Sequence, residues 1–483
     1  MTGNEQWSRE GVRPLTPVGE WLSARCAVSS GKVVMMIGAV AFIMACLSIA
    51  LQAPGQISMD TSIQLYEAFI GQSISFGPPF MSALFKWLGG GLIATSLFVF
   101  INTVLLYGSF ALVAVSIVQV RRQQGEVTLP LWRALLALLV LVNPLIFLYA
   151  GIVWKDVLFA SLMASGCACI IAASVGAGYR RYACGLVAIV LLSGAMITRQ
   201  QGVFMVPVML LGLIAALWPS GVRQRIYVVV AVIGVFALSL TVLQRQVDAT
   251  IKQPVNDATS VGLRILMTFD LAGMVSHSDK SASEYVMATT PEQLDAIRGL
   301  YSPERVDTLS HTSAVQFWAG QLSFDELKHA WWEMLKQNPQ AYLSHRAAVF
   351  AKLMGLNGLE GTLPIHIGIE GNETYLAALG IKQERSPRTQ VLYDIARSNF
   401  SSPIYRHAFW AVMLIVVMAL GAYARLSRRV LVVGAMIGVA TALMYASYLP
   451  TAIAADFRYL FGAIPLVTVL ALVVLLGGTS RQR

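Results

Sequence analysis

Long apolar stretches alternate with short polar connections along most of the chain. Ten of them are long enough to cross a bilayer, because about 20 helical residues span roughly 30 Å of hydrocarbon. We expect these membrane helices at about 33–53, 92–119, 131–150, 156–176, 183–198, 202–218, 226–244, 407–424, 430–448 and 459–477. The pattern predicts an all-α polytopic membrane protein with about ten transmembrane helices.

The composition agrees with this class. Of 483 residues, 56% are hydrophobic and 12% are charged, and the mean hydropathy is +0.66. A soluble domain carries roughly 25% charged residues, so about half of the usual solvating surface is missing. This excludes a soluble enzyme, a disordered protein and a disulfide scaffold. The apolar segment 33–53 follows a polar leader and is as long as a full span, which favours a retained helix over a cleaved signal peptide.

Basic residues predict how the chain is oriented. Cytoplasmic loops of membrane proteins are enriched in Lys and Arg. Ten helices with both termini in the cytoplasm place every basic segment on one side: Arg9, Arg13, Arg25 and Lys32; Arg121-Arg122; Arg180-Arg181; Arg223 and Arg225; Arg425 and Arg428-Arg429; Arg481 and Arg483. A different number of helices breaks this alternation. The short break Arg199-Gln200-Gln201 therefore separates two helices.

Two segments on the outer side are substantial, and they define the domain organisation. We expect a cytoplasmic tail at 1–32, membrane helices at 33–244 with a first outer loop at 54–91, an outer insert at 245–406, and three helices with a short tail at 407–483. The insert holds 15 Lys+Arg and 17 Asp+Glu, which gives it a net charge of −2. Since the whole chain has a net charge of +10, the residues outside the insert carry +12. The excess positive charge is explained by orientation, and we expect no nucleic-acid partner.

The insert shows a helical pattern and no metal motif. Apolar positions recur at helical spacing over 323–354, and turn signals such as Asn338-Pro339 separate such runs, so we expect four to six helices. No two of its histidines have the spacing of a metal pair on one helix face, which favours scattered, solvent-facing side chains over a metal cluster; these are His277, His311, His329, His345 and His366.

The first outer loop predicts two interfacial helices. Ile63, Tyr66, Glu67 and Ile70 form an amphipathic pattern, and 79–88 is apolar but too short to span. Within the first of these helices, Asp60-Thr61-x-x-Gln64 has two interpretations. It matches the S/T-x-x-E/Q capping box, with an acidic residue favoured at a helix N-terminus. It also places a carboxylate on the outer side, close to the membrane.

Further charged residues are predicted on that same side, at the ends of membrane helices. Each alone is consistent with a snorkelling or structurally paired side chain; they are Lys155, Asp156, Arg199, Asp456 and Arg458. Together with Asp60 they describe one polar site beneath the insert. Lys and Arg can stabilise a leaving phosphate, and a carboxylate can take a proton from an attacking hydroxyl. The sequence has no G-x-x-x-x-G-K-[ST] nucleotide motif. These features favour a membrane-resident donor, such as a sugar on a polyprenyl phosphate.

The motifs resemble those of a known family. Pro54-Gly55, Asp60-Thr61-x-x-Gln64 and Gly77-Pro78-Pro79 look like the first outer loop of bacterial membrane glycosyltransferases of the GT-C fold. Further signatures are similar at the outer ends of later helices: Trp154-Lys155-Asp156, Arg199-Gln200-Gln201-Gly202 and Phe457-Arg458-Tyr459. The resemblance does not cover 245–406. It implies a multi-pass protein of the bacterial inner membrane whose active site faces the periplasm.

The resemblance also implies roles for individual residues. Asp60 matches the catalytic base, and the donor phosphate is expected to contact Lys155, Arg199 and Arg458. Asp156 is expected to orient one of these cations or to assist catalysis. Candidates for substrate binding are Gln64, Tyr66, Gln201, Asp456 and Tyr459. Gly77 replaces the histidine that usually precedes the Pro pair, so any role of that histidine is absent or moved. No cofactor is implied beyond the lipid-linked sugar, and a divalent metal stays open.

The expected reaction is transfer of a sugar to a glycan, glycolipid or protein, with inversion at the anomeric carbon. Three other functions stay open from the sequence. A glycan polymerase or ligase would use a diphosphate-linked donor. A flippase or transporter would move a lipid-linked sugar without chemistry, although such proteins usually place polar groups at mid-bilayer. A receptor or assembly factor would account for the insert but not for the converging charges.

Overall fold

The computed structural model describes residues 27–75, 77–253, 258–281, 285, 290–310, 313–320, 322–424 and 426–477. Within them, eight helices are long and apolar enough to cross a membrane, and two shorter apolar helices accompany them. The ten are α2 (Ser30–Gln52), α5 (Gly91–Gln123), α6 with α7 (Leu131–Leu141, Pro144–Ala150), α8 (Lys155–Val175), α9 (Gly178–Thr198), α10 (Gly202–Leu217), α11 (Val222–Thr250), α19 (His407–Tyr423), α20 (Arg428–Thr451) and η4 with α21 (Phe457–Leu460, Ala463–Gly477). The all-α polytopic class is confirmed.

Three of the helices differ from the sequence pattern in instructive ways. The third span breaks at Asn143-Pro144, where the Asn143 side chain accepts a hydrogen bond from the Leu145 amide and starts α7. The last span begins with a 3₁₀ turn, Phe457–Leu460. Helix α11 continues past its apolar stretch to Thr250, whose hydroxyl accepts a hydrogen bond from the Trp87 indole. It therefore reaches, as a helix, the end of the bundle that carries α4 (Phe80–Trp87).

Helix α8 occupies the centre of the bundle. Its apolar window is entirely buried, whereas only 6% of the window of α11 is buried. Small residues explain this position, because they let neighbouring helices approach closely; they include Ala160, Ser161, Ala164, Gly166 and Cys167. The central position of α8 brings its first residues, Lys155 and Asp156, to the middle of one end of the bundle.

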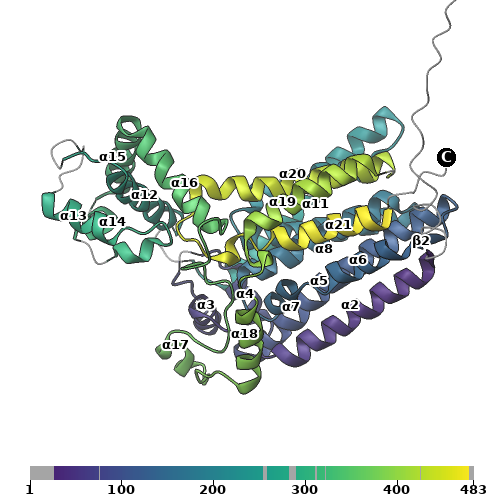
Figure 1. Ribbon diagram of the computed structural model, residues 1–483, viewed down its shortest axis with the longest axis horizontal. Helices are drawn as coiled ribbons and strands as arrows, with labels where there is room; N and C mark the ends of the chain where they lie inside the picture. The colour runs from purple at the N-terminus through teal and green to yellow at the C-terminus, as the bar shows by residue number, and fades with distance from the viewer. Residues whose placement is uncertain are drawn as a thin grey trace, which may run out of the picture.

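The basic connections gather at the other end of the bundle (Figure 1). There a short antiparallel pair joins β1 (Ala27–Ser29) to β2 (Thr128–Pro130), a small departure from the expected all-helical fold. Arg121 donates to the Thr128 carbonyl, Arg181 to that of Ala216, and Arg429 to that of Trp218. The chain alternates between the two ends ten times, as predicted, with these basic connections at one end and the insert at the other.

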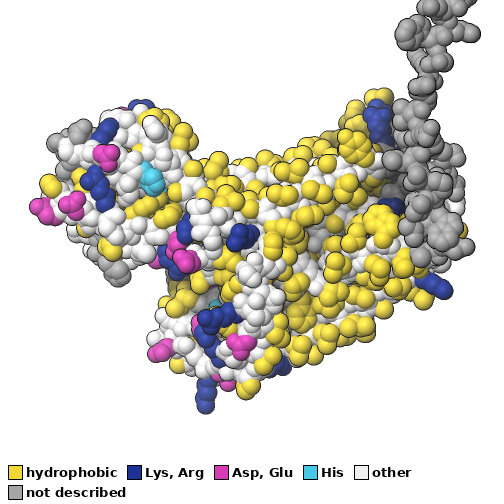
Figure 2. Space-filling view, viewed as in Figure 1, with side chains coloured by type: hydrophobic (Ala, Val, Ile, Leu, Met, Phe, Trp, Pro, Cys, Tyr) yellow, Lys and Arg dark blue, Asp and Glu magenta, His cyan; other side chains and the backbone are white. Residues whose placement is uncertain are grey.

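Two short helices and the insert lie at the end opposite to the basic connections. The predicted interfacial helices are present as α3 (Met59–Ile70) and α4 (Phe80–Trp87). The insert is mainly helical, as expected, with seven α-helices in its described part rather than four to six: α12 (Ala258–Ser276), α13 (Pro291–Leu300), α14 (Ser313–Gly320), α15 (Phe324–Gln337), α16 (Pro339–Leu353), α17 (Glu373–Ala378) and α18 (Pro387–Ser398). Hydrophobic side chains cover the visible face of the bundle, and charged ones gather towards the insert (Figure 2).

One segment of the insert, residues 359–371, is tied to the bundle by hydrogen bonds. The Phe457 amide donates to the Thr362 carbonyl at 2.8 Å, and the Tyr149 hydroxyl donates to that of Pro364 at 2.9 Å. The Ile57 amide donates to the Gly368 carbonyl at 2.9 Å. These contacts come from three separate parts of the chain, so the insert is built into the end of the bundle opposite to the basic connections.

The prediction of solvent-facing histidines is wrong for His345 and His366. His345 is fully buried, and its Nε2 lies 3.3 Å from an oxygen of Asp270, which also pairs with Arg346 at 2.6 Å. His366 is half-buried, and its Nε2 lies 2.7 Å from the Ile57 carbonyl oxygen. Both carry polar contacts that the sequence spacing could not indicate. His311 lies outside the described residues.

Candidate active site

The start of α3 is fixed against the connection between α7 and α8. Ser58 is the N-cap residue, but its hydroxyl accepts a hydrogen bond from the Trp154 indole at 2.8 Å. Thr61 donates to the Val153 carbonyl at 2.6 Å. The capping interpretation of Thr61 and Gln64 is therefore wrong: neither caps the helix. These two bonds instead fix the first turn of α3 and with it the position of Asp60.

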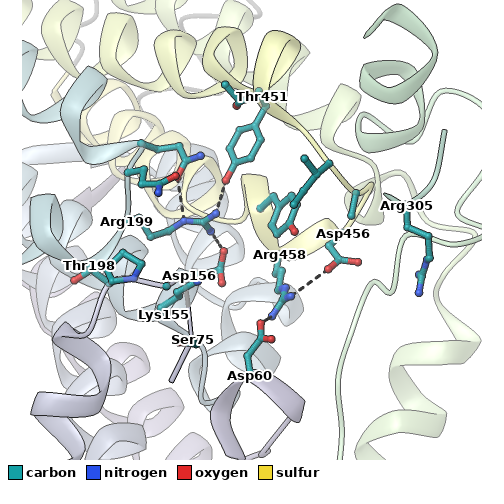
Figure 3. A pocket seen from close by; sticks show the side chains of 18 of the residues that line it. Asp60, Ser75, Lys155, Asp156, Thr198, Arg199, Arg305, Thr451, Asp456 and Arg458 are labelled. Atoms are coloured by element: carbon teal, nitrogen blue, oxygen red, sulfur yellow. Dashed lines mark hydrogen bonds and ion pairs between the residues drawn. The ribbon is translucent and has the colours of Figure 1, made fainter. Parts of the chain in front are cut away.

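Asp60 and Asp456 share one arginine. Arg458 Nη1 lies 2.5 Å from Asp60 Oδ2, and its Nη2 lies 3.2 Å from Asp456 Oδ2. The guanidinium also lies 4.9 Å from the centre of the Trp154 ring, within the range of a cation–π contact. Figure 3 shows the three charged side chains in a row along the cavity. The two carboxylates thus hold the edge of the Arg458 guanidinium, and the Trp154 ring contacts its face.

Arg199 forms a second, more buried centre. It pairs with Asp156, which is 2% exposed, and its Nη2 donates to the Tyr448 hydroxyl at 2.5 Å. Its Nε donates to Gln201 Oε1 at 3.3 Å, and the guanidinium lies 5.6 Å from the centre of the Tyr459 ring. A planar guanidinium carries five donors in a fixed fork and stacks on aromatic rings, so it can satisfy these partners at once. Asp156 thus orients Arg199.

Two cations in the cavity are not paired with a carboxylate of the described residues. Among the described residues, neither Lys155 nor Arg305 has a carboxylate within ion-pairing distance. Arg305 donates one hydrogen bond, to the Gly361 carbonyl at 3.0 Å. A Cβ at Gly77 would lie 3.3 Å from Lys155 Nζ, so glycine leaves room for this ammonium. Lys155 and Arg305 are therefore the groups best placed to meet an anionic ligand.

These groups line one cavity of about 450 Å³. Nine of the ten site residues predicted from the sequence border it: Asp60, Gln64, Lys155, Asp156, Arg199, Gln201, Asp456, Arg458 and Tyr459. Tyr66 does not; it stacks on Tyr375 of α17 with ring centres 4.4 Å apart. The sequence missed Arg305 and Tyr448, which also line the cavity.

The two carboxyls differ in their pKa. Burial raises the pKa of Asp60, but the positive charges of Arg458, Lys155 and Arg199 outweigh it and hold that pKa below the ordinary value. Burial also raises the pKa of Asp456, and there Arg458 and Arg305 offset it only in part, so the pKa stays above its ordinary value. Asp60 is thus ionised at neutral pH and keeps 42% of its side chain exposed to the cavity.

Glu67 supports the part of the cavity wall that Ser75 and Gly77 form. This carboxylate is 1% exposed, and its Oε1 accepts hydrogen bonds from the Ile74 and Ser75 amides, both at 2.8 Å. Its Oε2 accepts one from the Ser82 hydroxyl at 2.6 Å. A single buried side chain thus holds the turn after α3, which carries Ser75 and Gly77 to the cavity.

Among the described residues, no group of three or more His, Cys, Asp or Glu side chains could hold a metal ion. Two of the carboxylates that line the cavity, Asp60 and Asp456, are both engaged by Arg458.

Comparison with known proteins gives distant structural likenesses. No protein-family model matches the sequence, and no curated protein matches it. The Archaeoglobus fulgidus oligosaccharyltransferase, solved in complex with Zn and sulfate, is similar over 90% of this chain and 48% of its own, with a TM-score of 0.38 and 12% identity. ArnT from Cupriavidus metallidurans is similar over 92% of this chain and 77% of its own, with a TM-score of 0.33 and 13% identity.

This chain spans about half the length of the oligosaccharyltransferase. Both proteins are membrane glycosyltransferases of the GT-C fold, the class that the sequence motifs resemble.

Proposed function

We propose that this chain is a bacterial inner-membrane glycosyltransferase that transfers a sugar from a polyprenyl-phosphate donor to a hydroxyl of a glycan, glycolipid or protein at the periplasmic face. The observation that carries the proposal is the pairing of opposite charges in one cavity at the outer end of the bundle. Asp60 is ionised and open to the cavity, and Lys155, which also lines it, has no carboxylate within ion-pairing distance among the described residues. A general base and a phosphate-binding cation are the two groups that this reaction needs.

In the proposed reaction, Asp60 takes the proton of the acceptor hydroxyl as its oxygen attacks the anomeric carbon of the donor. The bond between that carbon and the phosphate oxygen breaks, and its electron pair stays on the polyprenyl phosphate. Lys155, Arg199 and Arg458 stabilise the negative charge that this phosphate gains. One displacement inverts the anomeric configuration. Asp156 acts indirectly, by orienting Arg199.

The orientation is part of the proposal. The basic connections lie at the end of the bundle opposite to the cavity, and such connections are enriched on the cytoplasmic side. Both termini would then be cytoplasmic, and the insert and the cavity would face the periplasm.

The role of Asp60 is tested by transfer from a polyprenyl-phosphate sugar with purified protein. Asp60→Asn keeps the size of the side chain but removes the base, and we expect the rate to fall by a factor of about 10² to 10⁴. Asp295→Asn is the matched control, since Asp295 is 82% exposed on α13 of the insert. Undiminished transfer by Asp60→Asn would remove Asp60 from the role.

A further inference from the structure

A second cavity meets the first at Asp60. It has a volume of about 470 Å³ and shares Asp60, Asp456, Arg458 and Leu363 with the first cavity. Its remaining walls come from Ser58 and Met59, Trp154, and the insert segment at 365–383. Asp60 and Arg458, which Figure 3 shows at the edge of the first cavity, therefore face two spaces.

The two cavities differ in charge. Arg458 is the one Lys or Arg among the described residues that line the second cavity, and it is already paired with two carboxylates. Glu370 adds a third carboxylate, which accepts a hydrogen bond from Arg385 Nε at 3.0 Å. Lys155 and Arg305, which have no carboxylate within ion-pairing distance in the described part of the chain, line the first cavity and not the second. An anionic group is thus favoured in the first cavity and disfavoured in the second.

The free polar atoms of the second cavity are mainly hydrogen-bond acceptors. Gln383 donates through Nε2 to the Gly371 carbonyl at 3.1 Å, which leaves its Oε1 as an acceptor. The Glu370 and Asp60 carboxylates accept only. A cavity lined by acceptors selects a ligand that brings several donors, which is a property of a polyhydroxylated molecule.

His366 adds one more acceptor at a defined place. Its Nε2 lies 2.7 Å from the Ile57 carbonyl oxygen, which can only accept, so Nε2 carries the hydrogen. Burial lowers the pKa of His366, and the hydrogen bond to Ile57 and the charge of Glu370 offset this only in part, so the ring is neutral. Nδ1 then has a free lone pair. His366 lies in the insert, which the motifs that resemble GT-C glycosyltransferases do not cover. In the first loop, Gly77 occupies the position where the family that these motifs resemble usually has a histidine.

Leu363 lines both cavities. Its φ of 43° lies in the left-handed region, which non-glycine residues rarely adopt, and its side chain is 54% exposed where both cavities meet. The backbone on either side is held, because the Thr362 and Pro364 carbonyls accept hydrogen bonds from the bundle. Such conformations persist where the surroundings impose them, often at functional sites.

From these observations we infer that the second cavity binds the acceptor as an uncharged saccharide, with His366 Nδ1 accepting a hydrogen bond from one of its hydroxyls. This assignment rests on the proposed glycosyl transfer and narrows its acceptor to a sugar. The volume is within the roughly 300–1,000 Å³ of small-molecule sites and suits the end of a glycan. The exposed apolar side chains of Met59 and Leu363 offer contact to the C–H faces of a sugar ring. Asp60 at the junction lies between saccharide and donor phosphate.

Ligand protection of introduced cysteines tests the assignment without any donor lipid. Cys26, Cys46 and Cys184 are first replaced by alanine, while Cys167 and Cys169 stay, buried in α8. Met59→Cys then reports on the second cavity and Ser75→Cys on the first. Phe69→Cys is the control, since it lies on the same helix as Met59, is 64% exposed and lines neither cavity.

We expect unphosphorylated hexoses and disaccharides to slow modification of Met59→Cys by a thiol reagent at least threefold and to leave Ser75→Cys and Phe69→Cys unchanged. Inorganic phosphate should protect Ser75→Cys alone. Protection of Met59→Cys by phosphate, or by a lysine-containing peptide but no saccharide, would overturn the assignment, as would no protection by any saccharide. Because no chemistry is involved, this result is independent of whether sugar transfer itself is found.

His366→Gln tests the role of the ring. The glutamine amide can still donate to the Ile57 carbonyl, so the contact to the first loop survives while the Nδ1 acceptor is lost. We expect the acceptor KM to rise roughly five- to tenfold, the effect of one hydrogen bond, with the donor KM changed less than twofold. His329→Gln, an exposed histidine on α15, is the control. An unchanged acceptor KM in His366→Gln would contradict the role.

Discussion

Arg458 joins the two carboxyls whose pKa values shift in opposite directions. The pKa of Asp60 lies below the ordinary value of 3.8 because three cations surround the carboxyl. The pKa of Asp456 lies above that value because the effect of burial dominates. As the pH falls, Asp456 is therefore protonated first and gives up its ion pair with Arg458, while Asp60 is still ionised. The first loss of activity on the acid side should come from Asp456 and not from the proposed base.

This order predicts a difference in pH dependence. Wild-type kcat/KM should fall along an acid limb centred above 3.8, as Asp456 is protonated. Asp456→Asn cannot titrate there, so its kcat/KM should be lower at neutral pH and flat across that range. A pH–rate profile of both proteins is the measurement. If the variant keeps the wild-type acid limb, another group controls it and the assignment to Asp456 is wrong.

At the residue scale, the sequence predicted the charged half of the site better than the rest. Lys155, Arg199 and Arg458 could be predicted to lie together because each lies at the same end of a membrane helix, where a charge is conspicuous. Asp60 could be added because it lies just after the first span, in the first turn of α3. Tyr66 does not border the cavity, for a geometric reason. It follows Gln64 by two positions, about 200° around the helix, so the two side chains point to different faces.

At the scale of elements, the turn after α3 depends on one buried side chain. Glu67→Ala would leave the Ile74 and Ser75 amides without their acceptor. We expect a loss of about 3 kcal/mol in stability, because each unsatisfied donor costs roughly 1–3 kcal/mol. Glu67→Gln retains one oxygen for these amides and should lose less.

Thermal unfolding in detergent and the donor KM together check this prediction. The midpoint should order as wild type, then Glu67→Gln, then Glu67→Ala. The donor KM should rise in Glu67→Ala, since Ser75 and Gly77 border the cavity. An alanine variant with the wild-type midpoint and donor KM would show that the turn does not depend on Glu67.

Hydropathy predicted most helices to within a few residues, for example 202–218 against Gly202–Leu217. It underestimated α11, because that helix continues into polar residues and its last residue, Thr250, is held by contacts to α4. The hydropathy pattern could not predict which parts of the insert contact the site. Arg305 reaches the cavity because its backbone pairs with Ala454, and the segment of His366 pairs with Ile57 through Ile369. Such pairings between distant segments leave no periodic signal in the sequence.

At the scale of the whole molecule, the basic end and the cavity end should lie on opposite sides of the membrane. A cysteine at Gln124, exposed in the basic connection after α5, should not react with an impermeant thiol reagent in intact bacterial cells. A cysteine at Ser398, exposed at the end of α18, should react. After the cells are opened, both should be labelled. The reverse pattern in intact cells would invert the proposed topology.

The identity of the released lipid tests the central claim most directly. Purified protein in proteoliposomes is supplied with a polyprenyl-phosphate sugar and a saccharide acceptor, and the lipid products are measured by mass spectrometry. We predict polyprenyl monophosphate, released in equal amount to the glycosylated acceptor. Activity only with a diphosphate-linked donor, releasing polyprenyl diphosphate, would identify a polymerase or ligase. Movement of the donor across the membrane without any transfer would identify a transporter, and either result would contradict the account.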